Sequence, residues 1–334
     1  MKNKLLLTTA IAGTFAFAGA SFAETKVVGN LETTFNAMSN DTAIQSGRQI
    51  DAETNIGLTG SKDLDNGLKA TYGFLLENGN SDTEYLTVGT DTVNIAVGTD
   101  FGNNLSSSAV PHVGDQAGSI VRAGIGSSTL TGGNIPVANV HNASHVALNI
   151  NGMGGTITAR YAPDLSNTRG SATNIDNDVG ESGTEFLYSG SLGVEGLKVL
   201  IGQGNTKDAT DTGTEDGKHQ KAGFSYNFGS FSVGAEKQKS EDSAATASQR
   251  ETDTDKVGIS FAASDSITLG LNYQETELKT GGTKATSDEE VVMVSVGYNL
   301  GGLGIQLQYA QVDNHLNVSG SDAEAFQIRT IQQF

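Results

Sequence analysis

Apolar residues recur at every second position through most of this chain, and the alternating segments are joined by connections that are in turn short and long. In the segment 292–300, for example, the apolar set is Val292, Val294, Val296, Tyr298 and Leu300. A period of two predicts strands with one apolar and one polar face. A soluble sandwich shares this period, but regular alternation of short turns and long loops is typical of an outer-membrane barrel. We therefore expect an all-β, antiparallel transmembrane β-barrel with short periplasmic turns and long external loops.

The pattern predicts sixteen strands, and the even number lets the first and last strands pair so that no edge meets lipid. The strands are expected near 26–35, 50–60, 68–77, 84–89, 92–99, 144–151, 155–162, 184–193, 197–204, 219–228, 231–239, 255–263, 267–276, 290–300, 303–312 and 323–334. Short connections are expected at 61–67, 89–91, 152–154, 194–196, 229–230, 264–266 and 301–302. Long ones are expected at 36–49, 78–83, 100–143, 163–183, 205–218, 240–254, 277–289 and 313–322.

The first residues are typical of a secretory signal peptide. Lys2 and Lys4 precede an apolar run from Leu5 to Ala18, and small residues stand one and three positions before Glu24. The run is shorter than the ~20 apolar residues that a membrane helix needs. We expect residues 1–23 to be a cleaved signal peptide and residues 24–334 to form the barrel of the outer membrane.

Composition limits the classes of partner. The chain has no cysteine, which excludes disulfides and thiolate metal sites, and its net charge of −18 argues against nucleic acid. Removing the two leader lysines leaves the expected mature chain at −20. With 43 glycines and a mean hydropathy of −0.25, the chain is too polar for a helical membrane protein.

One stretch resembles a known family. The run Asn55-Ile-Gly-Leu-Thr-Gly-Ser-Lys-Asp-Leu-Asp-Asn-Gly-Leu-Lys-Ala70 is similar to the second strand, turn and third strand of the proteobacterial general porins. Lys62 and Asp65 depart from that family's pattern. The segment 93–101 resembles the family's fifth strand, and 142–146 resembles the end of its constriction loop. The resemblance implies an outer-membrane homotrimer through which small hydrophilic solutes and ions diffuse passively.

The longest expected loop, 101–143, is the candidate constriction. A barrel of sixteen strands is too wide for side chains to fill, and an irregular segment can lie against its polar inner wall. A surface loop is the alternative for this segment. Charges on the inner wall and on the loop would then set selectivity. Positions of opposite parity to the apolar residues give the wall candidates Asp51, Glu53, Lys69, Arg160, Lys198, Lys221, Lys256 and Arg329, and the loop candidates are Asp100, Asp115 and Arg122. Each of them could instead be a hydrated wall charge without a transport role.

Acidic residues gather in the expected external loops, Glu241, Glu251, Asp253 and Glu290 among them. A negative mouth concentrates cations, so weak cation selectivity is expected. Alternatively, these acids keep the loops soluble or bind divalent ions that bridge them to lipopolysaccharide. Small residues on the lipid side of the first two strands, namely Gly29, Thr33, Ala52 and Thr54, predict a trimer interface there.

Other functions remain open at this point. A substrate-specific porin would share the whole layout. A barrel enzyme would need a base beside a nucleophile, or paired carboxylates at the rim, and no such pattern stands out among the five histidines. His141 and His145 have the spacing of a metal pair only if that piece is helical. An adhesin or β-solenoid would show a fixed repeat, and none is found. We expect no catalytic site, no metal and no cofactor.

Overall fold

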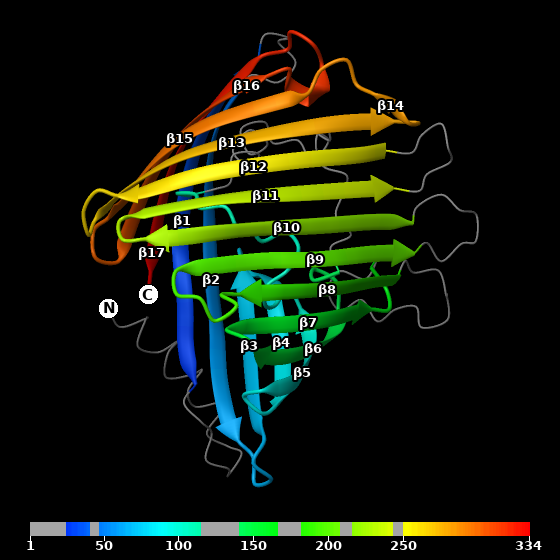
Figure 1. Ribbon diagram of the computed structural model, residues 1–334. Helices are drawn as coiled ribbons and strands as arrows, with labels where there is room; N and C mark the ends of the chain where they lie inside the picture. The colour runs from blue at the N-terminus through cyan, green and yellow to red at the C-terminus, as the bar shows by residue number, and fades with distance from the viewer. Residues whose placement is uncertain (1–24, 41–46, 115–139, 166–181, 208–215, 243–249) are drawn as a thin grey trace.

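The computed structural model describes residues 25–40, 47–114, 140–165, 182–207, 216–242 and 250–334. These residues form one antiparallel sheet that curls into a closed barrel, with β1 paired to both β2 and β17 (Figure 1). The signal peptide predicted for residues 1–23 lies outside the described residues. No helix in the described part of the chain is long and apolar enough to cross a membrane.

Sixteen of the described strands make the wall, which confirms the expected all-β barrel and its strand number. They are β1 Lys26–Asn40, β2 Gly47–Asp63, β3 Lys69–Glu77, β4 Asn80–Gly89, β5 Val93–Thr99, β6 His145–Gly152, β7 Gly155–Ala162, β8 Ser182–Gly190, β9 Leu197–Lys207, β10 Gly217–Phe228, β11 Phe231–Asp242, β12 Arg250–Ala262, β13 Ile267–Thr280, β15 Glu289–Asn299, β16 Leu303–Asp313 and β17 Ala323–Gln333. A two-residue strand, β14 (Thr283–Lys284), pairs only with β13, and a short 3-10 helix, η1 (His315–Asn317), lies before β17.

Alternating burial assigns the two faces of the wall. In β15, Val292, Val294 and Val296 are exposed, whereas Met293 and Ser295 between them are buried. The same alternation runs through β10, β12 and β13, and the exposed set is mainly apolar in the middle of each strand. Exposed apolar residues on the outside of a barrel are what lipid requires, so residues of the opposite parity face the lumen.

The connection between β3 and β4 is a tight turn rather than the long loop that the sequence pattern indicates. Residues 78–83 were expected as a long loop, but β4 begins at Asn80 and only Asn78 and Gly79 form the turn. Their φ angles are 48° and 84°, and a two-residue turn with positive φ at both positions matches the twist of a hairpin. Asn-Gly is the usual sequence of such a turn, so the signal was present.

A row of aromatic rings lies on the outside at the short-turn end of β10, β11 and β12. Phe228 stacks on Phe231 with ring centroids 5.9 Å apart, and Phe231 stacks on Phe261 at 4.6 Å. Tyr226 extends the row, 6.3 Å from Phe228. Aromatic girdles of this kind stand at the membrane interface of outer-membrane barrels. The row therefore indicates the height at which the lipid tails end.

Candidate functional site: the lumen and its wall-bound arm

Residues 101–114, which we call the arm, lie on the inner face of the wall. The arm begins at Phe101, whose ring stacks on His145 at 4.4 Å and lies 5.6 Å from Tyr85. The backbone N–H of Asp100 donates to the carbonyl of His141 at 2.7 Å, which joins the two ends of the β5–β6 connection. The rest of the predicted constriction loop, residues 115–139, lies outside the described residues, as do Asp115 and Arg122.

Leu105 anchors the first half of the arm. It packs with Ala109 of the arm and with Leu187 and Leu200 of β8 and β9, and all four are buried. Leu187 and Leu200 have the parity of the lumen face, opposite to the exposed Phe186 and Ile201. A small apolar cluster therefore exists inside the barrel because the arm covers it.

Arg160 of β7 and Glu185 of β8 form an ion pair beneath the arm, with only 3% and 1% of their surfaces exposed. The Arg160 guanidinium also donates to the carbonyl oxygens of Phe101, at 3.2 Å, and of Asn103. The Glu185 carboxylate accepts the backbone N–H of Leu105 at 3.4 Å. Buried charges need partners of this kind, and here the arm backbone supplies several of them.

A second buried pair joins Lys221 of β10 and Glu236 of β11, 3.5 Å apart and 4% and 3% exposed. The Lys221 ammonium donates to the carbonyl of Ser107 at 2.8 Å, and Glu236 accepts the N–H of Ala109 at 2.9 Å. Lys198 of β9 donates to the carbonyl of Ser108 at 2.9 Å. Together with Arg160 and Glu185, these side chains hydrogen-bond the arm to five consecutive strands, β7 to β11.

The opposite wall carries a separate charged group. Arg329 of β17 contacts both carboxylate oxygens of Glu32 of β1 at 2.5 Å, across the seam where the barrel closes. Glu53 of β2 accepts from the amide of Asn55 at 2.5 Å. Asp51, also of β2, is exposed. This wall is acidic in balance, because Arg329 is matched by Glu32 while Asp51 and Glu53 add two carboxylates.

The charges selected from the sequence fall into four settings. Arg160, Lys198 and Lys221 donate to the arm, and Lys256 lies beside them, 3.8 Å from Glu236. Asp51, Glu53 and Arg329 lie on the opposite wall. Asp100 precedes the arm, 3.5 Å from His141. Lys69 is exposed at the start of β3, apart from both groups.

Sequence reasoning missed the carboxylates of this site. Glu185 and Glu236 have the parity of the lumen face on β8 and β11, so alternation could have selected them along with the lysines. The signal that they contact an arm does not exist in either strand alone. It arises only when residues far apart in sequence meet, as Leu105 and Glu185 do at a separation of 80 positions.

The histidines near the arm serve as packing groups. The Nδ1 atom of His145 lies 2.9 Å from the carbonyl of Ala143, and its ring stacks on Phe101. Burial, together with the positive charge of Arg160 and with His145, lowers the pKa of His141 to about 4, so His141 is neutral at pH 7. Among the described residues, no three histidine, aspartate or glutamate side chains come together as a metal site would need.

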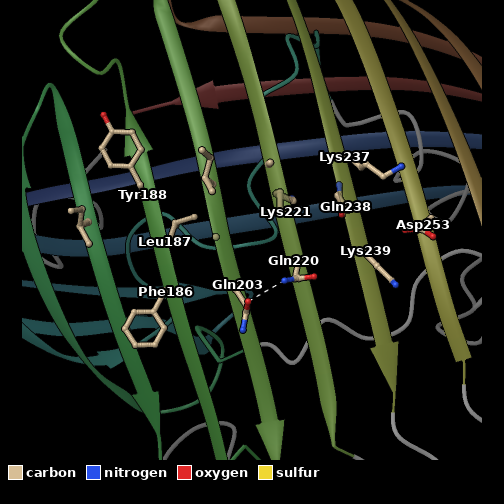
Figure 2. Close-up of a pocket in the computed structure, with 14 residues that line it drawn as sticks. Phe186, Leu187, Tyr188, Gln203, Gln220, Lys221, Lys237, Gln238, Lys239 and Asp253 are labelled. Atoms are coloured by element: carbon tan, nitrogen blue, oxygen red, sulfur yellow. Dashed lines mark hydrogen bonds between the residues drawn. The ribbon is translucent and has the colours of Figure 1, made fainter.

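The outer face has a shallow hollow of its own, of about 710 Å³, over β8 to β12 (Figure 2). Phe186 and Tyr188 border its apolar side, and Lys237 and Lys239 its charged side. Gln220 donates to Gln203 across it at 3.1 Å. The exposed side chains of this hollow belong to the outer face of the wall, so it does not lie on a path through the barrel.

Above the apolar band, the outer faces of β11, β12 and β13 carry ion pairs. Lys239 contacts Glu241 at 2.6 Å and Glu251 at 3.4 Å, and Lys279 contacts Glu251 at 2.8 Å and Asp253 at 3.7 Å. Several acids expected to make a negative mouth are therefore partly matched by lysines.

Solved structures share this architecture. OmpT of Vibrio cholerae, described as outer-membrane expressed, superposes with a TM-score of 0.70 at 14% identity, over 94% of this chain and 99% of that chain. An anion-selective porin from Comamonas acidovorans gives a TM-score of 0.67 at 17% identity, over 93% of this chain and 100% of that chain. A trimer form of in-vitro folded Vibrio cholerae OmpT gives 0.67 at 13% identity, over 94% and 100%. At these identities the likeness shows the fold alone.

Sequence comparison identifies the family. No curated protein sequence matches the chain. A family model described as Gram-negative porin matches residues 8–329, which is nearly the whole chain. The closed sixteen-stranded barrel agrees with that match. This chain is therefore a member of the Gram-negative porin family, an outer-membrane β-barrel.

Proposed function

We propose that this porin forms a water-filled channel for passive diffusion of small hydrophilic solutes and ions, without enzymatic activity. The observation that carries the proposal is a closed wall of sixteen strands with an arm along one part of its inner face. A barrel of this size leaves an aqueous lumen unless it is plugged. Beside the end of the arm, a polar recess of about 560 Å³ lies between His112, Val113 and Gly114 and the walls of β13 and β16.

The channel is proposed to prefer cations weakly. Arg160 and Lys221 form ion pairs with carboxylates and donate hydrogen bonds to arm carbonyls, so their charges are largely compensated within the wall. Asp51 and Glu53 stand on the opposite wall, and the chain has a net charge of −18. Both features favour cations in the lumen. Ion pairs at the mouth reduce the preference, which is why we propose a weak one.

The assembly is proposed to be a homotrimer, exported with cleavage after residue 23 and surrounded by outer-membrane lipid and lipopolysaccharide. The trimer form of Vibrio cholerae OmpT supports the first point by likeness of fold. Thr33, Ala52 and Thr54 are small and exposed on the outer face of β1 and β2, where subunits could approach closely. Gly29 on the same face is half-buried, and a Cβ added there would lie 2.7 Å from the ring of Phe334.

Planar-bilayer recording of the refolded mature chain tests the proposal. We expect steady open steps, grouped in threes, and a reversal potential of the sign for cations under a salt gradient. Absence of conductance from protein shown to be folded would contradict a channel, and a reversal potential favouring chloride would contradict the cation preference. A monomer band on unheated gels with intact folding would contradict the trimer.

A further inference from the structure

Beneath the arm, glycine occupies a lumen-facing position on each of the strands β9, β10, β11, β12, β13 and β15. None of these glycines has a φ in the left-handed region, so backbone conformation does not require them. Glycine weakens a strand because it packs no side chain and loses more entropy on folding. The residues, which we call the glycine track, are Gly202 and Gly204 of β9, Gly223 of β10, Gly234 of β11, Gly258 of β12, Gly270 of β13 and Gly297 of β15.

The arm occupies the space that side chains on the track would fill. A Cβ at Gly202 would lie 2.6 Å from Leu105, and one at Gly258 would lie 2.5 Å from Val110. A Cβ at Gly297 would lie 2.8 Å from Val113. Carbon atoms in ordinary contact are about 3.5–4.0 Å apart. Side chains at these three positions would therefore displace the arm residues that lie over them, away from the wall and into the lumen.

Hydrogen bonds hold the arm down along the same path. Besides the contacts of Arg160, Lys198, Lys221 and Glu236, the amide of Asn272 on β13 donates to the carbonyl of Pro111 at 2.8 Å. Polar contacts thus reach from β7 to β13, and the apolar side chains of the arm sit between them on the glycines. Shape and hydrogen bonding both place the arm flat against one side of the wall.

We propose that the glycine track sets the cross-section of the pore by determining how closely the arm lies against the wall. This inference rests on the proposed channel function and adds to it the residues that control the width. The arm is a fixed part of the wall, and the width of the open lumen depends on how far the arm projects from the glycine track. Larger side chains on the track narrow the channel by more than their own volume, because they displace the arm as well.

Gly297→Leu tests the proposal against Gly304→Leu as a matched control. Gly297 and Gly304 lie on the neighbouring strands β15 and β16, and both face the lumen. At Gly297 the arm residue Val113 is the close neighbour, whereas at Gly304 the nearest atom is a strand carbonyl 3.8 Å away. Both variants add the same volume to the wall, so only displacement of the arm distinguishes them.

Single-channel conductance in a planar bilayer is the readout, with folding checked by circular dichroism and by resistance to unfolding on unheated gels. We expect a loss of conductance in Gly297→Leu that exceeds the loss in Gly304→Leu. Equal conductance in the two folded variants would overturn the proposal. If the unaltered chain does not conduct at all, the proposed channel function fails instead, and the position of the arm is then tested separately by cross-linking.

The cross-link is Ala109→Cys with Gly223→Cys in this cysteine-free chain. A Cβ at Gly223 would lie 3.0 Å from the Cβ of Ala109, and disulfides span about 3.5–4.5 Å between Cβ atoms, so a shift of a few tenths of an ångström suffices. We expect the disulfide to form in folded protein, because the arm lies against β10 at this position. Failure to cross-link in protein shown to be folded would overturn a fixed arm.

Discussion

Replacing Arg160 by methionine should destabilise the barrel strongly. Arg160 and Glu185 are almost fully buried, and the substitution leaves the Glu185 carboxylate without its cation. Removing one partner of a buried ion pair costs about 3–5 kcal/mol. The guanidinium also donates to the carbonyls of Phe101 and Asn103, so the entry to the arm is weakened at the same time.

The double variant Arg160→Met with Glu185→Leu separates the two effects. Replacing a buried pair by apolar residues of similar size is often neutral or stabilising, so most of the lost stability should return. The free energy of unfolding is measured in urea with lipid vesicles, and circular dichroism is the probe because the chain has no tryptophan. A double variant no more stable than Arg160→Met would refute the account of an uncompensated carboxylate.

Three further changes test other parts of the structure. Burial lowers the pKa of His141 to about 4, and Arg160 and His145 add to the shift. The unfolded chain therefore binds the proton first, and stability should fall as the pH drops from about 6.5 towards 4. His141→Gln should make the curve of unfolding midpoint against pH less steep in this range, and an unchanged slope would contradict the assignment. Lys237→Ala breaks an exposed pair with Asp255, 3.0 Å long, and should change the unfolding free energy by only about 0–1 kcal/mol, so a larger loss in urea would show a role beyond the pair. Gly229 lies in the turn between β10 and β11, with a φ of 69° and open space around its Cα. Gly229→Ala should therefore lower the free energy of unfolding by about 1–2 kcal/mol through backbone strain alone. An unchanged urea midpoint would rule that strain out.

Alternation made the strands of the barrel predictable, because lipid outside and water inside impose it on each strand separately. The segment 292–300, expected as a strand from its apolar residues, lies almost wholly in β15. Boundaries at the long-loop end were less predictable. β2 begins at Gly47 and β13 continues to Thr280, since polar residues above the apolar band still pair with their neighbours.

The arrangement of side chains in the lumen was harder to predict from the sequence. Parity assigned Lys221 to the inner wall, but it could not indicate that Ser107 and Glu236 would surround the ammonium group. Likewise, glycines such as Gly258 and Gly297 read as weak positions within strands when each strand is considered alone. Their common role becomes visible only when adjacent strands are aligned in register beneath the arm.

The seam between β1 and β17 determines the order in which the barrel can form. Neighbouring strands elsewhere follow one another along the chain, whereas Glu32 and Arg329 at the seam are 297 positions apart. Closing a loop of that length carries the largest entropic cost in the sheet, and less local contacts form more slowly. Until they meet, both strands present unpaired backbone groups along an edge. We therefore expect closure to come late in folding, and the half-formed sheet to be open until then to a strand from another chain.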